Sequence, residues 1–259
     1  MIEAYVTVVS AVFGLLIGSF LNACAYRLPL GISIAAGRSF CPACTTQIRA
    51  VDNVPLVSWA LLRGRCRACG ATISWRYPAV EALTAGLFAA VAAATGPSPV
   101  LPLELLFVAA LVLVSDIDLA ERIIPDVVIL PVALIGLVGM TVLDPGGAPR
   151  WAWLAAGLGA GGLLLGAGLL YERLRGVQGM GMGDVKLAMC MGFFLGAAVI
   201  PALFIGFIVG AVAGVALLAR GQSARTAIPF GPFLALGGVV ALLCGDQLLQ
   251  LYLHAALRS

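Results

Sequence analysis

Charge is scarce in this sequence. Charged side chains make up 10% of the 259 residues and hydrophobic side chains 62%, which together with a mean hydropathy of +1.09 excludes a soluble globular domain. The sequence also lacks the alternating pattern of membrane β-strands, which excludes a barrel. Its apolar runs have about the 20 residues that a helix needs to cross a bilayer. We therefore predict an all-α, polytopic membrane protein with about eight transmembrane helices.

A positively charged leader is missing at the start. No basic residue precedes the first apolar run, Ala4 to Tyr26, and only Glu3 lies close to it. A cleaved signal peptide carries basic residues at this place, so we interpret the run as the first membrane helix.

Acidic residues are nearly absent between the first two predicted helices, where Asp52 is the one carboxylate. Seven arginines occupy the same segment: Arg27, Arg38, Arg49, Arg63, Arg65, Arg67 and Arg76. The positive-inside rule makes this segment cytoplasmic and puts the N-terminus outside. Alternation of the later helices then places thirteen of the fifteen basic residues inside. A nucleic-acid patch is the alternative, but we expect lipid and not nucleic acid as the partner.

Three regions follow from this pattern. We expect a first transmembrane helix at residues 1–28, a cytoplasmic segment at 29–78, and a membrane domain of about seven helices at 79–259. The middle segment holds two C-x2-C pairs, made by Cys41, Cys44, Cys66 and Cys69. Four thiolates at this spacing are typical of a structural zinc site, and about 50 residues are too few to fold on an apolar core alone. Two redox-active pairs are the alternative.

Two aspartates lie where predicted helices meet the cytoplasmic side. Asp118 closes the third helix and Asp184 opens the sixth. Carboxylates within a few ångströms of each other can share a proton, so that one activates a water molecule and the other protonates the carbonyl or leaving group. This is aspartic protease chemistry. Asp116 competes with Asp118, because residues two apart on a helix point about 200° apart and only one can face a shared site.

Glycines precede Asp184, at Gly179, Gly181 and Gly183. No strand comes before them and no Lys-Ser/Thr pair follows, so a nucleotide-binding loop is not indicated. We expect these glycines to let the backbone pass close to a substrate or carboxylate. Lys186 either tunes Asp184 or extends to the membrane surface. Helix capping is the alternative role for Asp184.

Several local expectations concern packing. Small residues four apart in the fifth and seventh helices predict close helix contacts, at Gly157, Gly161, Gly206 and Gly210 among others. Pro201 is expected to separate the sixth and seventh helices. The single cysteines Cys24, Cys190 and Cys244 are expected to be small buried residues. Asp126, after Pro125, is a candidate cap for the fourth helix.

The motifs and their order resemble the bacterial type IV prepilin peptidase family. The resemblance rests on Gly18-Ser19-Phe20-Leu21-Asn22, the two cysteine pairs, Arg63-Gly64-Arg65-Cys66, Ser74-Trp75-Arg76-Tyr77-Pro78, Asp116-Ile117-Asp118, Ile124-Pro125-Asp126, Gly181-Met182-Gly183-Asp184 and Pro229-Phe230-Gly231-Pro232. Members of that family are inner-membrane aspartic endopeptidases. The resemblance implies cleavage of the basic leader of type IV prepilins or type II secretion pseudopilins at the cytoplasmic face.

Site residues also follow from the resemblance. It implies that Asp118 and Asp184 are the catalytic pair, which resolves the choice against Asp116. Members with the cysteine pairs usually also methylate the new N-terminal amine with S-adenosylmethionine, and the family links the position of Gly64 to methyl transfer. N-methyltransferase activity with this donor is therefore expected, although no donor pocket can be identified in the sequence.

Two other classes remain open from the residues alone. Intramembrane acids beside glycine-broken helices also occur in ion-coupled transporters, but the acids here lie at helix ends and no internal repeat is evident. A non-catalytic scaffold organised by zinc is the third hypothesis. The pattern does not predict an oligomeric state.

Overall fold

The computed structural model describes residues 1–34, 38–143, 147–176, 180–221 and 229–256, and its regular structure over these ranges is helical. This confirms the all-α prediction. The chain forms two compact units, Met1–Leu101 and Pro102–Ser259.

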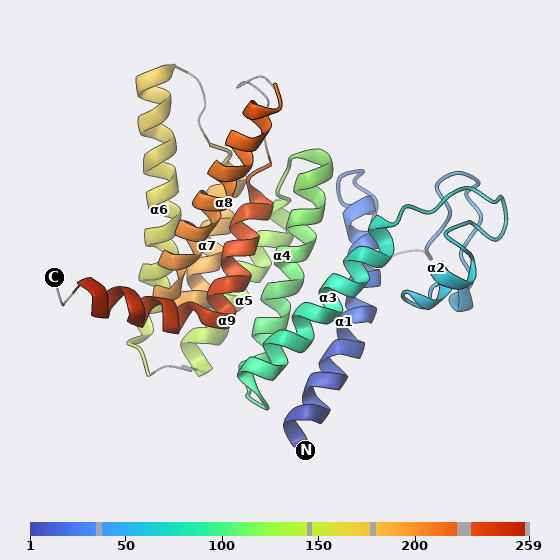
Figure 1. The fold of residues 1–259 in the computed structure, drawn as a ribbon, viewed down its shortest axis with the longest axis horizontal. Coiled ribbons are helices and arrows are strands. Elements are labelled where there is room, and N and C mark those ends of the chain that lie inside the picture. Colours follow the sequence, from blue (N-terminus) through green and yellow to red (C-terminus); the bar gives the residue numbers. More distant parts are fainter. Residues whose placement is uncertain (35–37, 144–146, 177–179, 222–228, 257–259) are drawn as a thin grey trace. The chain divides into compact units, whose positions relative to one another are not determined.

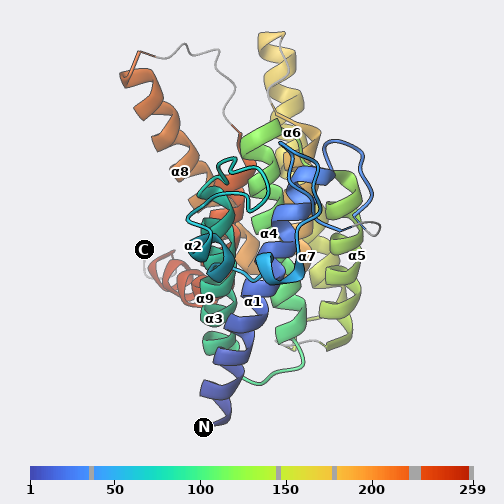
Figure 2. The same cartoon turned by 90° about the vertical axis from the view of Figure 1, so that its right-hand side faces the viewer.

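The amino-terminal unit is built on two long helices, α1 (Ile2–Arg27) and α3 (Arg76–Thr95), which lie side by side in Figures 1 and 2. Their contact depends on glycine. A Cβ at Gly14 would lie 2.8 Å from Ala85 Cα, and one at Gly18 would lie 2.7 Å from Glu81 Cα. Backbones approach this closely in membrane proteins only where side chains are small.

Between α1 and α3 the chain forms the cysteine segment. It contains the short helices η1 (Ala50–Asp52) and α2 (Val57–Leu61). Each cysteine pair sits in a turn closed by one isolated bridge, Phe40 to Gln47 and Arg65 to Thr72. The segment is therefore held by local turns and by its docking on the helices, with very little regular structure.

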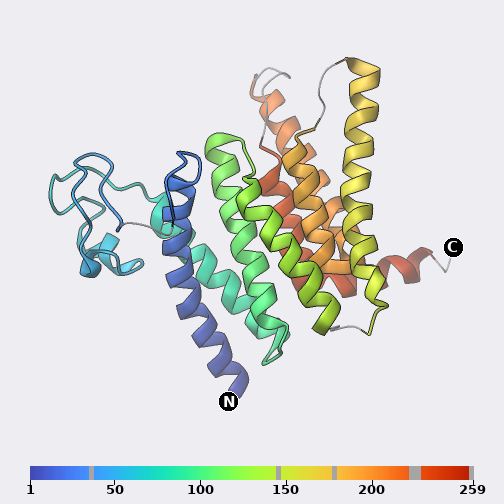
Figure 3. The same cartoon turned by 180° about the vertical axis from the view of Figure 1, so that it is seen from behind.

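In its described residues, the carboxy-terminal unit forms six long helices: α4 (Leu101–Glu121), α5 (Asp126–Leu143), α6 (Arg150–Arg175), α7 (Met182–Leu195), α8 (Val199–Ala219) and α9 (Gly231–Ala256). In Figure 3, α7 lies between α5 and α6, and it packs on both. α4 is buried along most of its length, and Phe107 stacks on Phe194 of α7 with ring centroids 4.6 Å apart.

Small residues mediate several contacts in this unit. A Cβ at Gly157 or Gly161 of α6 would meet α7, and one at Gly206 or Gly210 of α8 would meet the start of α9. These glycines confirm the predicted packing faces. Gly159, Gly162 and Gly166 have open space around their Cβ positions, so the glycine richness of α6 is only partly explained by packing.

Two local predictions are wrong. A 3₁₀ turn, η2 (Gly196–Ala198), separates α7 from α8. Pro201 lies inside the first turn of α8. An N–H in the first turn has no partner within the helix, so a proline there costs no helical hydrogen bond. Gly196, at φ +54°, provides the break that we expected from proline. Cys24 and Cys190 are buried as expected, but Cys244 is exposed.

Among the described residues, five segments are long and apolar enough to cross a membrane, and one of them runs from Met182 to Ala219 through η2. α4 is not among them because it carries four carboxylates, Glu104, Asp116, Asp118 and Glu121. The multi-pass architecture is supported, while the predicted number of eight spans is not confirmed.

Candidate active site

Asp118 lies in the last turn of α4. Its side chain is buried, with 5% of the residue exposed, and its Oδ2 accepts a hydrogen bond from the backbone N–H of Gly231 at 2.9 Å. Gly231 is the first residue of α9, where the N–H groups have no partner within the helix. Asp118, at the end of α4, therefore accepts a hydrogen bond from one of the free N–H groups at the start of α9.

The chain leaves α4 by a turn at Arg122. This residue has φ +58°, and its N–H donates to the backbone carbonyl of Asp118 at 2.9 Å. A left-handed arginine is unfavourable, and such conformations gather near functional sites. The turn leads through Ile124 and Pro125 into α5, so its geometry controls how the segment after Asp118 approaches α7.

Asp184 lies in the first turn of α7 and is half-buried. Its backbone N–H donates to the Gly181 carbonyl at 3.1 Å, and its carboxylate accepts a hydrogen bond from the Gly181 amide. These reciprocal bonds resemble a capping box. Asp184 therefore caps α7, and the same contact fixes where the carboxylate points.

The two acids come to one site. The carboxylate of Asp118 acts electrostatically on that of Asp184, so residues far apart in sequence, on α4 and α7, are brought close in space. Asp116 is also buried, with 7% exposed, and has its own polar interaction.

The glycine before Asp184 allows a close contact. A Cβ at Gly183 would lie 2.9 Å from Cβ of Ile124, so the Ile124-Pro125-Asp126 turn rests directly on the start of α7. Gly181 has Asp184 Oδ2 at 3.2 Å from the corresponding position. Gly179 lies outside the described residues.

Lys186 forms an ion pair with Asp126. Its Nζ lies 2.7 and 2.8 Å from the two carboxylate oxygens, linking α7 to the start of α5. Sequence reasoning had paired Lys186 with Asp184 or the membrane surface, and had given Asp126 only a capping role. Residues 60 positions apart carry no local signal of such a pair.

The four cysteines of the segment between α1 and α3 form one cluster. The sulfur atoms of Cys41, Cys44, Cys66 and Cys69 all lie within 4.8 Å of one another. Cys41 Sγ and Cys69 Sγ are 3.9 Å apart. Sulfurs around a tetrahedral zinc, with bonds of about 2.3 Å, lie about 3.8 Å apart. The donor set therefore fits a metal ion of this kind.

The two cysteine turns share one hydrogen-bond pattern. The N–H of Thr45 donates to Cys41 O and that of Gly70 to Cys66 O, at 2.8 and 2.9 Å. Both residues have positive φ, +57° and +73°. Thr45 thus adopts the conformation that a glycine favours. Hydrogen bonds to Thr46 lower the pKa of the Cys44 thiol to about 6, which favours the thiolate form that binds metals.

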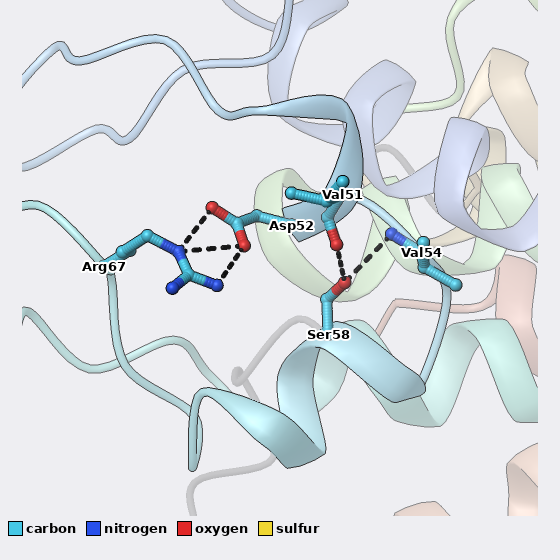
Figure 4. A network of polar contacts seen from close by, with 5 residues as sticks. All are labelled: Val51, Asp52, Val54, Ser58 and Arg67. Atoms are coloured by element: carbon cyan, nitrogen blue, oxygen red, sulfur yellow. Dashed lines mark hydrogen bonds and ion pairs between the residues drawn. The ribbon is translucent and has the colours of Figure 1, made fainter.

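Polar contacts outside the cluster brace the segment. Figure 4 shows the Arg67 guanidinium against the Asp52 carboxylate, with Nη2 2.6 Å from Oδ1. These hydrogen bonds lower the pKa of Asp52. In the same view, Ser58 Oγ donates to the Val51 carbonyl and accepts from the Val54 amide. The second cysteine turn is thereby fastened to the chain between the two pairs.

The role of Gly231 escaped sequence reasoning. The residue contributes a backbone N–H, and no side-chain pattern reveals such a donor. The one available signal was its place between an aromatic residue and Pro232 at the start of a predicted helix.

The fold and site define a polytopic helical protein in which two aspartates from different helices lie near enough for one carboxylate to act electrostatically on the other. Two family profiles match the sequence. The profile of the Bacterial Peptidase A24 N-terminal domain matches residues 12–95, and the profile of the Type IV leader peptidase family matches residues 105–215. The chain belongs to this family of type IV leader peptidases.

Curated relatives match over nearly their whole length. A prepilin leader peptidase/N-methyltransferase of Aeromonas hydrophila is 38% identical over 270 residues, covering 93% of this chain and 91% of that protein. The proteins of the same name from Bacillus subtilis (strain 168) and Pseudomonas aeruginosa are 34% and 36% identical, with coverage of 95% and 94% of this chain and 97% and 92% of theirs. No solved structure matches the chain. These names favour a peptidase over the ion-coupled transporter that the residues left open.

Proposed function

We propose that this protein is a membrane-embedded aspartic endopeptidase that removes the leader of type IV prepilins or type II secretion pseudopilins and then methylates the new N-terminal amine. The peptidase half is supported by the placement of Asp118 and Asp184 at helix ends, near enough for one carboxylate to act electrostatically on the other. The names of the relatives support both halves.

In the proposed cleavage, Asp118 and Asp184 share a proton. One carboxylate takes a proton from a water molecule, which attacks the scissile carbonyl, while the other protonates the carbonyl oxygen. The Gly231 amide holds Asp118 in one orientation and the Gly181 amide holds Asp184. We assign Gly181 and Gly183 to positioning, Lys186 to joining α7 to the start of α5, and no direct chemical step to Asp116.

The cysteine cluster is proposed to hold a structural zinc ion through Cys41, Cys44, Cys66 and Cys69. When bound, such an ion would supply a rigid cross-link between the two cysteine turns. Its four thiolates leave no open position for substrate.

Orientation follows from charge. With the arginine-rich segment in the cytoplasm, the N-terminus lies outside the inner membrane and both aspartates face the cytoplasmic side. The basic leader of a prepilin would reach the site from there, while its apolar helix stays in the lipid.

Cleavage of a purified prepilin by the detergent-solubilised protein tests the proposal. We expect Asp118→Asn and Asp184→Asn each to reduce cleavage by about 10³-fold or more. Glu121→Gln removes an exposed carboxylate from the same turn of α4 and should keep wild-type activity. Full activity in either aspartate variant would exclude the shared-proton mechanism.

A further inference from the structure

The cysteine segment exposes large apolar side chains although it lies outside the membrane helices. On α2, Val57 and Leu61 are 53% and 77% exposed, and residues four apart lie on one face of a helix. Val51 and Val54, just before α2, are exposed as well. These four residues, Val51, Val54, Val57 and Leu61, are called the α2 patch below.

The opposite side of α2 is firmly packed. Ser58 is buried, and its hydroxyl binds the backbone of Val51 and Val54 (Figure 4). Trp59 Nε1 donates to the Ile73 carbonyl at 3.1 Å. The helix therefore has a defined inner side, and the exposure of the α2 patch is a property of the folded segment.

One hydrogen bond places α2 near the membrane surface. The N–H of Leu56, at the start of α2, donates to Oε2 of Glu81 at 2.7 Å. Glu81 belongs to α3, which is long and apolar enough to cross a membrane, and it lies about 7.5 Å along that helix from its first residue. Trp75, directly before α3, is 73% exposed, and indole rings at such places gather at the membrane surface.

Unpaired positive charge adjoins the α2 patch. Residues 38–76 contain six arginines and one carboxylate, Asp52, which pairs with Arg67. Arg63 and Arg65 follow α2 directly and are exposed, and neither forms an ion pair within the described part of the chain. Basic clusters beside a membrane helix are attracted to anionic lipid.

We propose that the α2 patch, together with Arg63 and Arg65, docks on anionic phospholipid of the cytoplasmic leaflet. The proposal rests on the orientation given in the proposed function, which puts this segment in the cytoplasm. The apolar side chains enter the boundary between head groups and acyl chains, and the arginines bind lipid phosphates. An acidic protein would also suit the arginines, but the contact of α2 with Glu81 on a membrane helix favours lipid.

Photocrosslinking in vesicles tests the docking. Full-length protein with Leu61→benzoylphenylalanine is reconstituted in phosphatidylcholine alone or mixed with phosphatidylglycerol, and irradiated. Mass spectrometry should find a lipid adduct at this position, in higher yield with phosphatidylglycerol. Equal yields in the two lipids, a crosslink to a second copy of the chain in place of lipid, or no adduct would each overturn the proposal.

Charge variants in the same vesicles test the arginines. One arginine near an anionic surface strengthens attraction about fivefold, so Arg63→Gln combined with Arg65→Gln should weaken docking about 25-fold and lower the adduct yield. Arg173→Gln combined with Arg175→Gln removes two exposed arginines from the end of α6 and is the matched control. Equal adduct yields from the two double variants would contradict the role of Arg63 and Arg65.

Hydrogen exchange of the wild type gives a readout that depends on no variant. Backbone amides of residues 54–65 should exchange more slowly in phosphatidylglycerol vesicles than in phosphatidylcholine, and equal rates would reject docking. Prepilin cleavage is measured in the same vesicles. Cleavage without docking would overturn this inference and leave the peptidase proposal standing, whereas docking without cleavage would support the inference and count against the peptidase.

Discussion

The backbone amide of Gly231 donates a hydrogen bond to Oδ2 of Asp118 across 2.9 Å, and this bond joins the start of α9 to the end of α4. An N–H at a helix start has no partner inside the helix, and a hydrogen bond to a carboxylate is stronger than one between neutral groups. α9 thus contributes to the site through its backbone, and the position of its first residue beside α4 sets the orientation of Asp118.

Gly231→Ala tests this relationship. A Cβ at this position would lie 2.7 Å from Asp118 Oδ2, so the carboxylate must move. A hydrogen bond to a charged group contributes about 1.5–3 kcal/mol, so we expect the rate of prepilin cleavage to fall about tenfold to a hundredfold. Gly159→Ala, in open space on α6, is the matched control. Wild-type cleavage by Gly231→Ala would mean that the contact does not position Asp118.

The Lys186–Asp126 pair gives a second test. Both side chains are partly exposed, 28% and 56%, and pairs of this kind contribute about 0–1 kcal/mol. We therefore expect Lys186→Gln and Asp126→Asn each to slow cleavage by no more than about fivefold, with the double variant no worse than either single one. A loss of about a hundredfold for Lys186→Gln alone would instead assign the lysine a direct role beside Asp184.

The helical architecture was predictable because a bilayer imposes it. Twenty-residue apolar runs have one stable form in lipid, so composition alone predicted the all-α fold. The number of spans was less accessible, since α4 combines a buried face with four carboxylates. The helix break at Gly196 was missed because proline commonly ends a helix and Pro201 was taken as the break. Pro201 instead lies in the first turn of α8, where proline is compatible with a helix.

The residues alone predicted that carboxylates at cytoplasmic helix ends could act as a pair, since ionisable groups are costly at a membrane. They left Asp116 and Asp118 as alternatives, and only the family resemblance selected Asp118 together with Asp184. The contacts around these residues could not be predicted. The Gly231 donor belongs to the backbone, and the Lys186–Asp126 pair spans two helices. Each of these depends on which helices are neighbours, and hydrophobic patterns do not encode that.

The cysteine cluster predicts a measurable metal content. Elemental analysis of the purified protein should give about one zinc per chain, and Cys41→Ser or Cys69→Ser should lower it substantially, because three thiolates bind the ion more weakly than four. Cys244→Ser removes an exposed thiol outside the cluster and should leave the zinc content unchanged. Zinc-free protein with four intact thiols would contradict the assignment and revive the alternative of two redox pairs.

Close packing of α1 on α3 predicts opposite effects for two glycine substitutions. At Gly18 a Cβ would meet backbone, 2.7 Å from Glu81 Cα, so the helices must separate. Overpacking of this kind costs about 1–3 kcal/mol, and Gly18→Ala should lower the thermal midpoint of the detergent-solubilised protein. Gly86→Ala on α3 meets nothing within 4 Å and should raise or preserve the midpoint, because alanine favours a helix by up to about 1 kcal/mol. An unchanged midpoint in Gly18→Ala would mean that the two helices can separate at this point without loss of stability.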